Sequence, residues 1–133
     1  MIYALDANII TYMLKGDDKL IGHYRLESDT GSVFVIPPIV YFEIQRWLLT
    51  TQHRKRLTQF TEICQSAEIV EFSQRVWRKL AEIYAILRRQ GILIDDADIF
   101  IAAYCLVNGF TLVTNNTRHF ARIDGLHAVN WKE

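Results

Sequence analysis

Residues 94–116 read IDDADIFIAAYCLVNGFTLVTNN, and this stretch decides the class of fold. Three acidic residues in four positions precede a nearly unbroken apolar run, which is typical of a helix buried on most sides. Gly109 is suited to end that helix, and residues 111–114 (TLVT) then have the composition of a buried strand. A buried helix that leads through a short turn into a buried strand is a building unit of α/β proteins.

The rest of the chain alternates in the same way. Further strands are expected at residues 2–5, 32–36, 68–70 and, at the edge, 127–129. Helices are expected at residues 9–15, from 17 onward, at 38–51, at 53–66, between Ser73 and Gly91, and at 97–108. This alternation predicts an α/β fold with a central, mainly parallel sheet of four to five strands and helices on both faces.

Composition narrows the classes of protein that remain. The 133 residues fit a single domain, 1–133, and a hydrophobic content of 50% argues against disorder. Lys and Arg number 15 and Asp and Glu 15, so the net charge is zero and any surface for nucleic acid must be local. The early Asp6 argues against a signal peptide and no apolar run approaches the length of a membrane span, so we expect a cytoplasmic protein without a membrane partner.

Several kinds of catalytic site lack their motifs in this sequence. No glycine pattern matches a dinucleotide fold or a P-loop, and no G-x-S-x-G elbow is present. The histidines have no paired zinc spacing, and Cys64 and Cys105 match neither a zinc nor a redox spacing, so we expect both thiols to be reduced and buried. Asp6 lacks the second aspartate two residues on that an aspartyl-phosphate enzyme needs.

Acidic and amide side chains remain as the candidates for chemistry. Asp6 directly follows the first strand, and Asn115 and Asn116 directly follow the strand at 111–114. Glu43 lies about one and a half turns into the helix after the second strand, and Asp98 lies in the first turn of the buried helix. Because sites in parallel sheets form at the carboxyl ends of strands, these side chains are expected to converge.

Each acid also has a simpler explanation. One of Asp95, Asp96 and Asp98 is enough to cap the helix, although three acids exceed that need. Asp6 has the position of a turn residue, and helix glutamates such as Glu43 are usually solvated. Together the acids indicate more than capping or solvation, because gathering them has a cost. Two carboxylates 4 Å apart repel by about 4 kcal/mol at an effective dielectric constant of 20. Three of them gather only around a cation or with raised pKa values, and Mg²⁺ or Mn²⁺ with a phosphodiester substrate fits that requirement.

The chain resembles the PIN-domain family, and specifically the VapC-type toxins of type II toxin–antitoxin systems. The matching stretches, in the expected order, are LDANII (5–10), VYFEIQRWL (40–48), IDDADIFIAAYCLVNGFTLVTNNTRHF (94–120) and GLHAVNW (125–131). The resemblance implies a three-layer PIN fold and a Mg²⁺- or Mn²⁺-dependent endoribonuclease. By matched position it implies Asp6, Glu43 and Asp98 as metal ligands, and these three with Asn116 as the catalytic residues.

The chain departs from the family pattern at three positions. Asn116 stands where many members have a fourth aspartate, Ala7 where Ser or Thr is usual, and Trp47 where glycine is frequent. With a neutral fourth corner, we expect one well-bound metal ion and a second supplied only with RNA. Whether Asp95 or Asp96 offsets the missing charge stays open.

The resemblance also implies partners. Asn8, Arg46, Asn115 and Arg118 lie in or beside the matched stretches and are expected to bind the RNA substrate. A VapB-type antitoxin is expected to lay its C-terminal tail across a groove on the toxin, and the protein is expected to form a homodimer.

The apolar surface of the antitoxin groove has candidate residues in the sequence. Tyr12, Trp47 and Leu48 would suit such a groove, the alternative being that they are ordinary core residues.

Two other functions compete with a toxin ribonuclease. A non-catalytic module that binds RNA or antitoxin is favoured by the departures at Ala7 and Asn116. A PIN nuclease of RNA processing, without toxicity, would use the same acidic residues.

Overall fold

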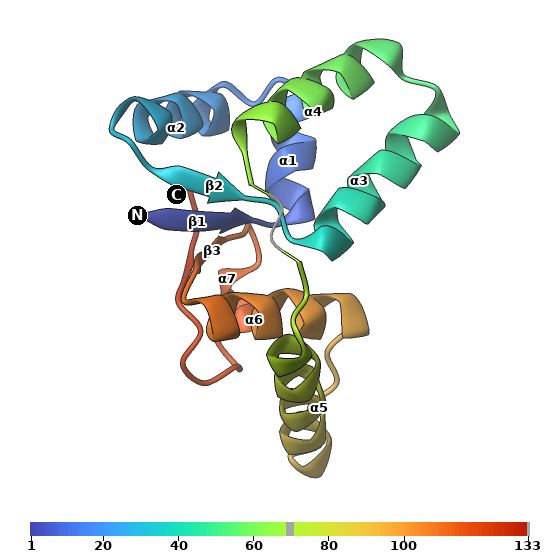
Figure 1. Ribbon diagram of the computed structural model, residues 1–133, viewed down its shortest axis with the longest axis vertical. Coiled ribbons are helices and arrows are strands. Elements are labelled where there is room, and N and C mark those ends of the chain that lie inside the picture. The colour runs from blue at the N-terminus through green and yellow to red at the C-terminus, as the bar shows by residue number, and fades with distance from the viewer. Residues whose placement is uncertain (69–70, 133) are drawn as a thin grey trace.

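A parallel sheet forms the centre of the molecule, in a computed structural model that describes residues 1–68 and 71–132 (Figure 1). Its strands, in the spatial order β2-β1-β3-β4, are β1 Ile2–Leu5, β2 Val33–Val35, β3 Thr111–Val113 and β4 Ala128–Val129. Tyr3 of β1 lies opposite Phe34 of β2 on one side and Thr111 of β3 on the other. The pairings among the described strands are all parallel, which confirms the predicted sheet.

The segment at 68–70 adds a single bridge rather than a described strand. Glu68 pairs in parallel with Val35, accepts a hydrogen bond from the Ile36 N–H at 2.9 Å and donates its own N–H to the Phe34 carbonyl at 2.9 Å. The other two residues of the predicted strand, 69 and 70, lie outside the described residues.

Helices cover both faces of the sheet. They are α1 Ala7–Leu14, α2 Asp18–Asp29, α3 Pro38–Thr51, α4 Arg54–Ser66, α5 Gln74–Arg89, α6 Asp96–Asn108 and α7 Thr117–Phe120. In Figure 1, α1 to α4 lie on one side of the sheet, and α5 and α6 lie on the other. The three-layer arrangement expected from the sequence is therefore present.

Local sequence signals explain most helix ends. The Ser73 hydroxyl accepts a hydrogen bond from the Val76 N–H and begins α5, and Pro38 occupies the first turn of α3. Gly109 ends α6 with a φ of 71°, a conformation that costs glycine little. Helix α7 is not predicted from the sequence, because four residues are too few to show helical periodicity.

Leu48 belongs to the core and cannot line a groove. Its exposed fraction is 0%, and it continues the buried face of α3 that Val40 and Ile44 begin at a spacing of four residues. Tyr12 and Trp47 are only half-buried. The hypothesis of an apolar surface formed by all three residues is therefore wrong for Leu48, which packs inward because of its helical register.

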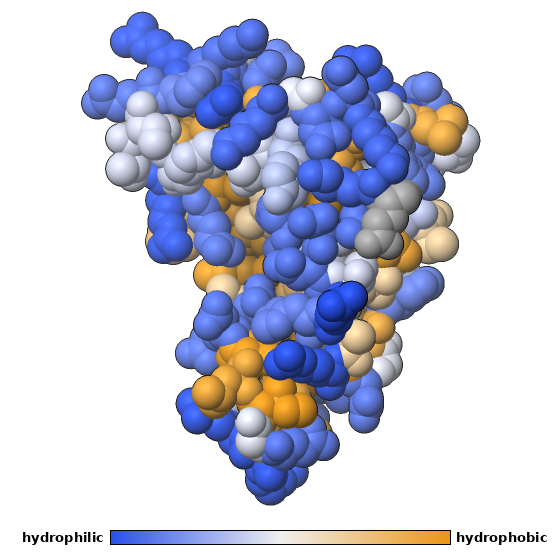
Figure 2. All heavy atoms as spheres, turned by 180° about the vertical axis from the view of Figure 1, so that it is seen from behind, coloured by the Kyte–Doolittle hydropathy of each residue, from blue (hydrophilic) through white to orange (hydrophobic). Residues whose placement is uncertain are grey.

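Other apolar side chains do reach the surface. Trp77, Tyr84 and Ile86 of α5 and the nearby Leu93 are exposed, and Figure 2 shows hydrophobic side chains gathered at the end of the molecule that α5 occupies. A patch of this kind is more common on proteins that associate with a partner. Within residues 1–68 and 71–132, no helix has both the length and the apolar character needed to cross a bilayer.

Candidate functional site

Asp6 is built into the junction between the sheet and the first helix. Its N–H donates to the Val113 carbonyl of β3 at 3.0 Å, so the end of β1 is held beside the end of β3. One carboxylate oxygen, Oδ1, accepts the Ala7 N–H at 2.7 Å and caps α1. The side chain is nearly buried, with an exposed fraction of 5%. Asp6 therefore acts as a turn residue at the start of α1 and also belongs to the candidate site.

Thr114 holds the other oxygen of Asp6. Its hydroxyl, with an exposed fraction of 0%, donates to Asp6 Oδ2 at 2.7 Å and accepts the Asn116 N–H at 3.0 Å. This threonine was not singled out from the sequence. Its one signal there is position, because it follows β3 as Asp6 follows β1, and neighbouring parallel strands end at the same edge.

Asp98 contacts a histidine rather than capping its helix. His119 Nε2 lies 3.1 Å from Asp98 Oδ2, and both side chains are partly exposed. Asp95 occupies the N-cap position of α6, but its side chain makes no capping hydrogen bond. The capping explanation for Asp98 is therefore wrong.

His119 is the second residue that sequence reasoning missed. The histidines have no zinc spacing, and the one sequence signal for His119 is its place in the stretch TRHF at 117–120. The ring comes from α7, the helix that periodicity could not predict. It brings a potential positive charge to an otherwise acidic centre.

Electrostatics show that the three acids share one region. Burial raises the pKa of Asp6, Glu43 and Asp98, and this is the largest cause for each. The negative charge of Asp98 raises the pKa of Asp6 further, and both aspartates raise the pKa of Glu43. Asp6 after β1, Glu43 on α3 and Asp98 on α6 are therefore electrostatic neighbours, because such coupling requires proximity.

Neighbouring charges and hydrogen bonds also change the pKa values of Asp6 and Asp98. The hydrogen bonds from Thr114 and Ala7 lower the pKa of Asp6, and His119 lowers that of Asp98 by its charge and its hydrogen bond. Asp95 acts in the opposite direction and raises the pKa of Asp98. Asp95 is thus an electrostatic neighbour of the cluster, while Asp96 is an exposed residue of the first turn.

The donor set suits a hard divalent cation. It consists of carboxylate oxygens that repel one another, and a bound cation would relieve that repulsion. In the described part of the chain, no three Asp, Glu, His or Cys side chains stand close enough to form a ready-made metal cage. A cation here would therefore take some of its ligands from water or phosphate, as Mg²⁺ usually does.

The Cys105 thiol is buried and close enough to Asp6 to respond to its charge. Burial is the main reason that its pKa is raised far above the ordinary range, and the charge of Asp6 raises it further. Both cysteines are free, as predicted, but only Cys105 is fully buried, whereas Cys64 is half-buried.

The asparagines after β3 have different positions. Asn116 is exposed, and its side chain makes no hydrogen bond within the described residues. The Asn115 N–H donates to Asn8 Oδ1 at 3.2 Å, and Asn115 Oδ1 accepts from Asn130 at 3.4 Å. Asn8 and Asn115 therefore hold the loop beside the site in place.

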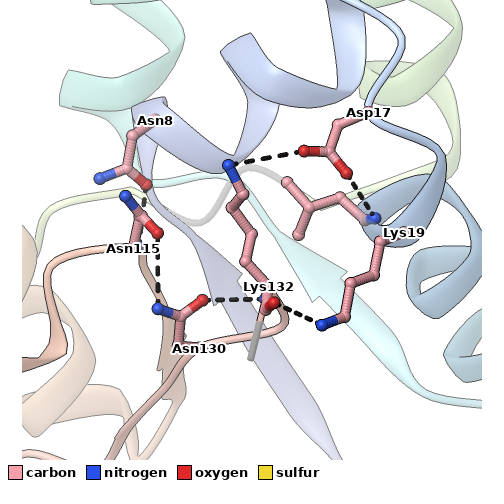
Figure 3. A network of polar contacts seen from close by, with 7 residues as sticks. Asn8, Asp17, Lys19, Asn115, Asn130 and Lys132 are labelled. Atoms are coloured by element: carbon pink, nitrogen blue, oxygen red, sulfur yellow. Dashed lines mark hydrogen bonds and ion pairs between the residues drawn. The ribbon is translucent and has the colours of Figure 1, made fainter.

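Figure 3 shows how this loop is anchored to the end of the chain. Asn130 Oδ1 accepts the Lys132 N–H at 2.9 Å, the Lys132 carbonyl accepts from Lys19 Nζ at 2.6 Å, and Lys132 Nζ lies 3.5 Å from Asp17. The C-terminal segment thereby ties α1 and α2 to the loop that carries Asn115.

The two predicted arginines lie at the borders of the site. Arg46, one turn after Glu43 on α3, stacks over the Phe42 ring at 4.9 Å, and its charge lowers the pKa of Glu43. Arg118 is exposed on α7, one residue before His119.

Comparison with known proteins agrees with this fold. The PIN domain family matches residues 3–126. Ribonuclease VapC2 of Rickettsia felis is 31% identical over 133 residues, 98% of each chain. Among solved structures, VapBC2 from Rickettsia felis, bound to a DNA fragment from their promoter, matches with a TM-score of 0.90 at 28% identity, over 98% of this chain and 99% of that one. VapBC-1 from nontypeable Haemophilus influenzae matches with a TM-score of 0.88 at 25% identity, over 100% of both chains. The chain therefore belongs to the PIN-domain family, where it groups with the VapC ribonucleases.

Proposed function

We propose that this protein is the endoribonuclease toxin of a toxin–antitoxin pair and that it cleaves RNA with a Mg²⁺ or Mn²⁺ ion held by Asp6, Glu43 and Asp98. The observation that carries the proposal is the electrostatic coupling of these three carboxylates, which come from separate elements. Asp98 raises the pKa of Asp6, and both aspartates raise the pKa of Glu43. A protein tolerates such repulsion where a function needs it. The similarity to Ribonuclease VapC2 supports RNA as the substrate.

The chain's own side chains have separate tasks in this proposal. When bound, a divalent cation would polarise the phosphate and lower the pKa of a nearby water. The Thr114 hydroxyl and the Ala7 N–H fix the Asp6 carboxylate and favour its charged form. His119 fixes Asp98 in the same way, and second partners of this kind are needed for correct ligand orientation.

Asn116 takes the place of a fourth acid. Its exposed amide would orient water or phosphate without adding a negative charge. We propose that the protein itself holds one cation firmly and that a second enters only with RNA. The same region supplies Asn8, Arg46 and Asn115 as neighbours of the substrate, of which Arg46 is the only cation.

The test is cleavage of total RNA by purified protein with Mg²⁺ or Mn²⁺, with sequencing of the new RNA ends. Asp98→Asn should lose about a hundredfold of the cleavage rate or more, because it removes one charge from the cation site. Asp29→Asn, an exposed aspartate at the end of α2 on the other side of the sheet, is the matched control and should cleave at the wild-type rate.

Two results would refute the proposal. Metal-dependent cleavage that survives Asp98→Asn at full rate would place the activity elsewhere. Absence of divalent binding by calorimetry near millimolar concentration, together with no cleavage, would leave a non-catalytic binding module. Growth arrest on expression, relieved by the neighbouring gene, distinguishes a toxin from a nuclease of RNA processing.

We further propose that a VapB-type antitoxin lays an apolar segment into the cleft between α1, α2 and α4. Two adjoining hollows of about 310 and 370 Å³ open there and share Met13, Leu14 and Ile21. The co-occurrence of VapB and VapC in the solved relatives supports this partner. Ile21→Asp should weaken capture of the antitoxin while leaving RNA cleavage unchanged, and equal capture by both proteins would contradict the placement. Homodimer formation stays a prediction, for light scattering to measure.

A further inference from the structure

A hollow of about 470 Å³ opens beside the acidic cluster, along α7 and the residues around it. Its lining is formed by Asn115, Asn116, Thr117, Arg118, His119 and Arg122. His119 belongs both to this lining and to the contact with Asp98 at 3.1 Å. The hollow therefore adjoins the acids directly, and a chain bound at the acids would extend into it.

The charge of the hollow is opposite to that of the acids. Arg118 and Arg122 are both exposed, and neither forms an ion pair or lies over an aromatic ring in the described part of the chain. By contrast, Arg46, Arg56 and Arg88 each lie over a ring. Two guanidinium groups that are free of ion pairs among the described residues, in a polar hollow, present the planar donors that suit a phosphate.

The hollow continues away from the acids. Arg122 also lines a second, smaller hollow of about 140 Å³. The other polar residues of that lining are Lys79 of α5, Gln90 at the C-cap of α5 and Asp124, and the remaining five lining residues are apolar. Arg122 thus joins the two hollows, and the cationic side chains along them are Arg118, Arg122 and Lys79. A linear polyanion fits such a track better than a compact ligand does, because successive charges meet successive donors.

We propose that Arg118 and Arg122 bind an internal backbone phosphate of single-stranded RNA next to the bond that is cut, and that the strand leaves the acids toward α5. The proposal rests on the ribonuclease function above and names a subsite for its substrate. The acids hold the reacting phosphate through a cation, whereas the arginines hold the neighbouring phosphate directly. Arg118 and Arg122 are therefore binding residues that do not touch the reacting atoms.

The test measures binding of a short single-stranded RNA, labelled at its 3′ end, by fluorescence anisotropy in EDTA. Without divalent cations the acids repel phosphate, so the arginines dominate the signal. Arg118→Gln and Arg122→Gln should each weaken binding about three- to tenfold, and the double variant should lower the slope of log Kd against log salt by about 1.4. Arg25→Gln on α2, on the other side of the sheet, changes the net charge equally and should bind like wild type.

Two further measurements test which phosphate is bound and whether the arginines act on binding alone. RNA with and without a 5′-phosphate should bind equally, because the subsite takes an internal phosphate. A requirement for the 5′-phosphate would overturn that assignment. In cleavage assays with metal, the double variant should raise KM and leave kcat near the wild-type value, since it does not alter the acids.

The outcomes separate the subsite from the ribonuclease function. If wild type cleaves RNA but the double arginine variant binds and cleaves as Arg25→Gln does, the subsite is wrong and the ribonuclease function stands. If wild type does not cleave RNA with either metal, the ribonuclease function fails, while the anisotropy series still decides whether Arg118 and Arg122 bind a strand. Circular dichroism of each variant confirms that the fold is retained.

Discussion

Replacing Thr114 by Val tests whether a buried hydroxyl supports the acidic centre. The hydroxyl donates to Asp6 Oδ2 at 2.7 Å and accepts the Asn116 N–H at 3.0 Å. A hydrogen bond to a charged group contributes about 1.5–3 kcal/mol, and valine has nearly the same volume, so no large cavity forms. The Asn116 N–H belongs to an exposed residue, so it can donate a hydrogen bond to water when the Thr114 hydroxyl is removed. We therefore expect the free energy of unfolding to fall by about 2–3 kcal/mol at neutral pH.

The loss should depend on pH, and the direction follows from Asp6. The Thr114 hydrogen bond lowers the pKa of Asp6, so it stabilises the ionised carboxylate. Once Asp6 is protonated in acid, only a neutral hydrogen bond is lost, worth about 1 kcal/mol. The difference between wild type and variant should therefore shrink as the pH falls.

Urea unfolding followed by circular dichroism measures this difference at neutral and at acidic pH. With a slope of about 1–3 kcal/mol per molar urea, the midpoint should shift by about 1–2 M at neutral pH. Thr111→Val is the matched control, because Thr111 of β3 is also buried, but among the described residues its hydroxyl contacts only Met1 Sδ, at 3.8 Å. The reasoning is refuted if Thr114→Val destabilises no more than Thr111→Val, or if its cost is the same at both pH values.

Three further predictions concern the core and the acids. Leu48→Ala should lower the free energy of unfolding by about 2–5 kcal/mol in urea titrations, because the side chain is fully buried; a loss below that of an exposed Leu49→Ala would contradict its place in the core. Because the pKa of Glu43 is raised on folding, its contribution to stability is complete below about pH 4 and is lost as the pH rises through the raised value. Glu43→Gln should thus gain stability relative to wild type with rising pH in metal-free buffer, and a constant difference would exclude a raised pKa. Saturating Mg²⁺ at neutral pH should add about 1–3 kcal/mol to wild type in thermal melts, and an equal gain in Asp98→Asn would show that the ion binds elsewhere.

The class of fold, and the assignment of Asp6 and Asp98 to the site, could be predicted from local sequence signals. An apolar helix with surplus acids at its start indicated that Asp98 has a role beyond capping, and an aspartate directly after a buried strand indicated Asp6. The carboxyl ends of parallel strands meet at one edge, so a parallel sheet was enough to predict that these residues converge. Glu43 depended more on the family resemblance, because a helix glutamate has no local signal that separates a site from solvent.

The partners of the acids were decided by the tertiary structure. Thr114 meets Asp6 across 108 positions of sequence, and His119 meets Asp98 across 21. Such contacts depend on strand order and on a four-residue helix, which periodicity within a short window does not encode. The same holds for Asn8, whose side-chain carbonyl accepts the Asn115 N–H across 107 positions.

Patterns along the chain therefore determined which face of each element is apolar and which acids stand at strand and helix ends. Burial, and with it the raised pKa values, exists only once the layers pack together. Whether Arg118 and Arg122 have acidic partners is likewise a property of the packed molecule. The physical reason is that hydrophobic periodicity is local, whereas desolvation and charge coupling depend on distances between residues far apart in sequence.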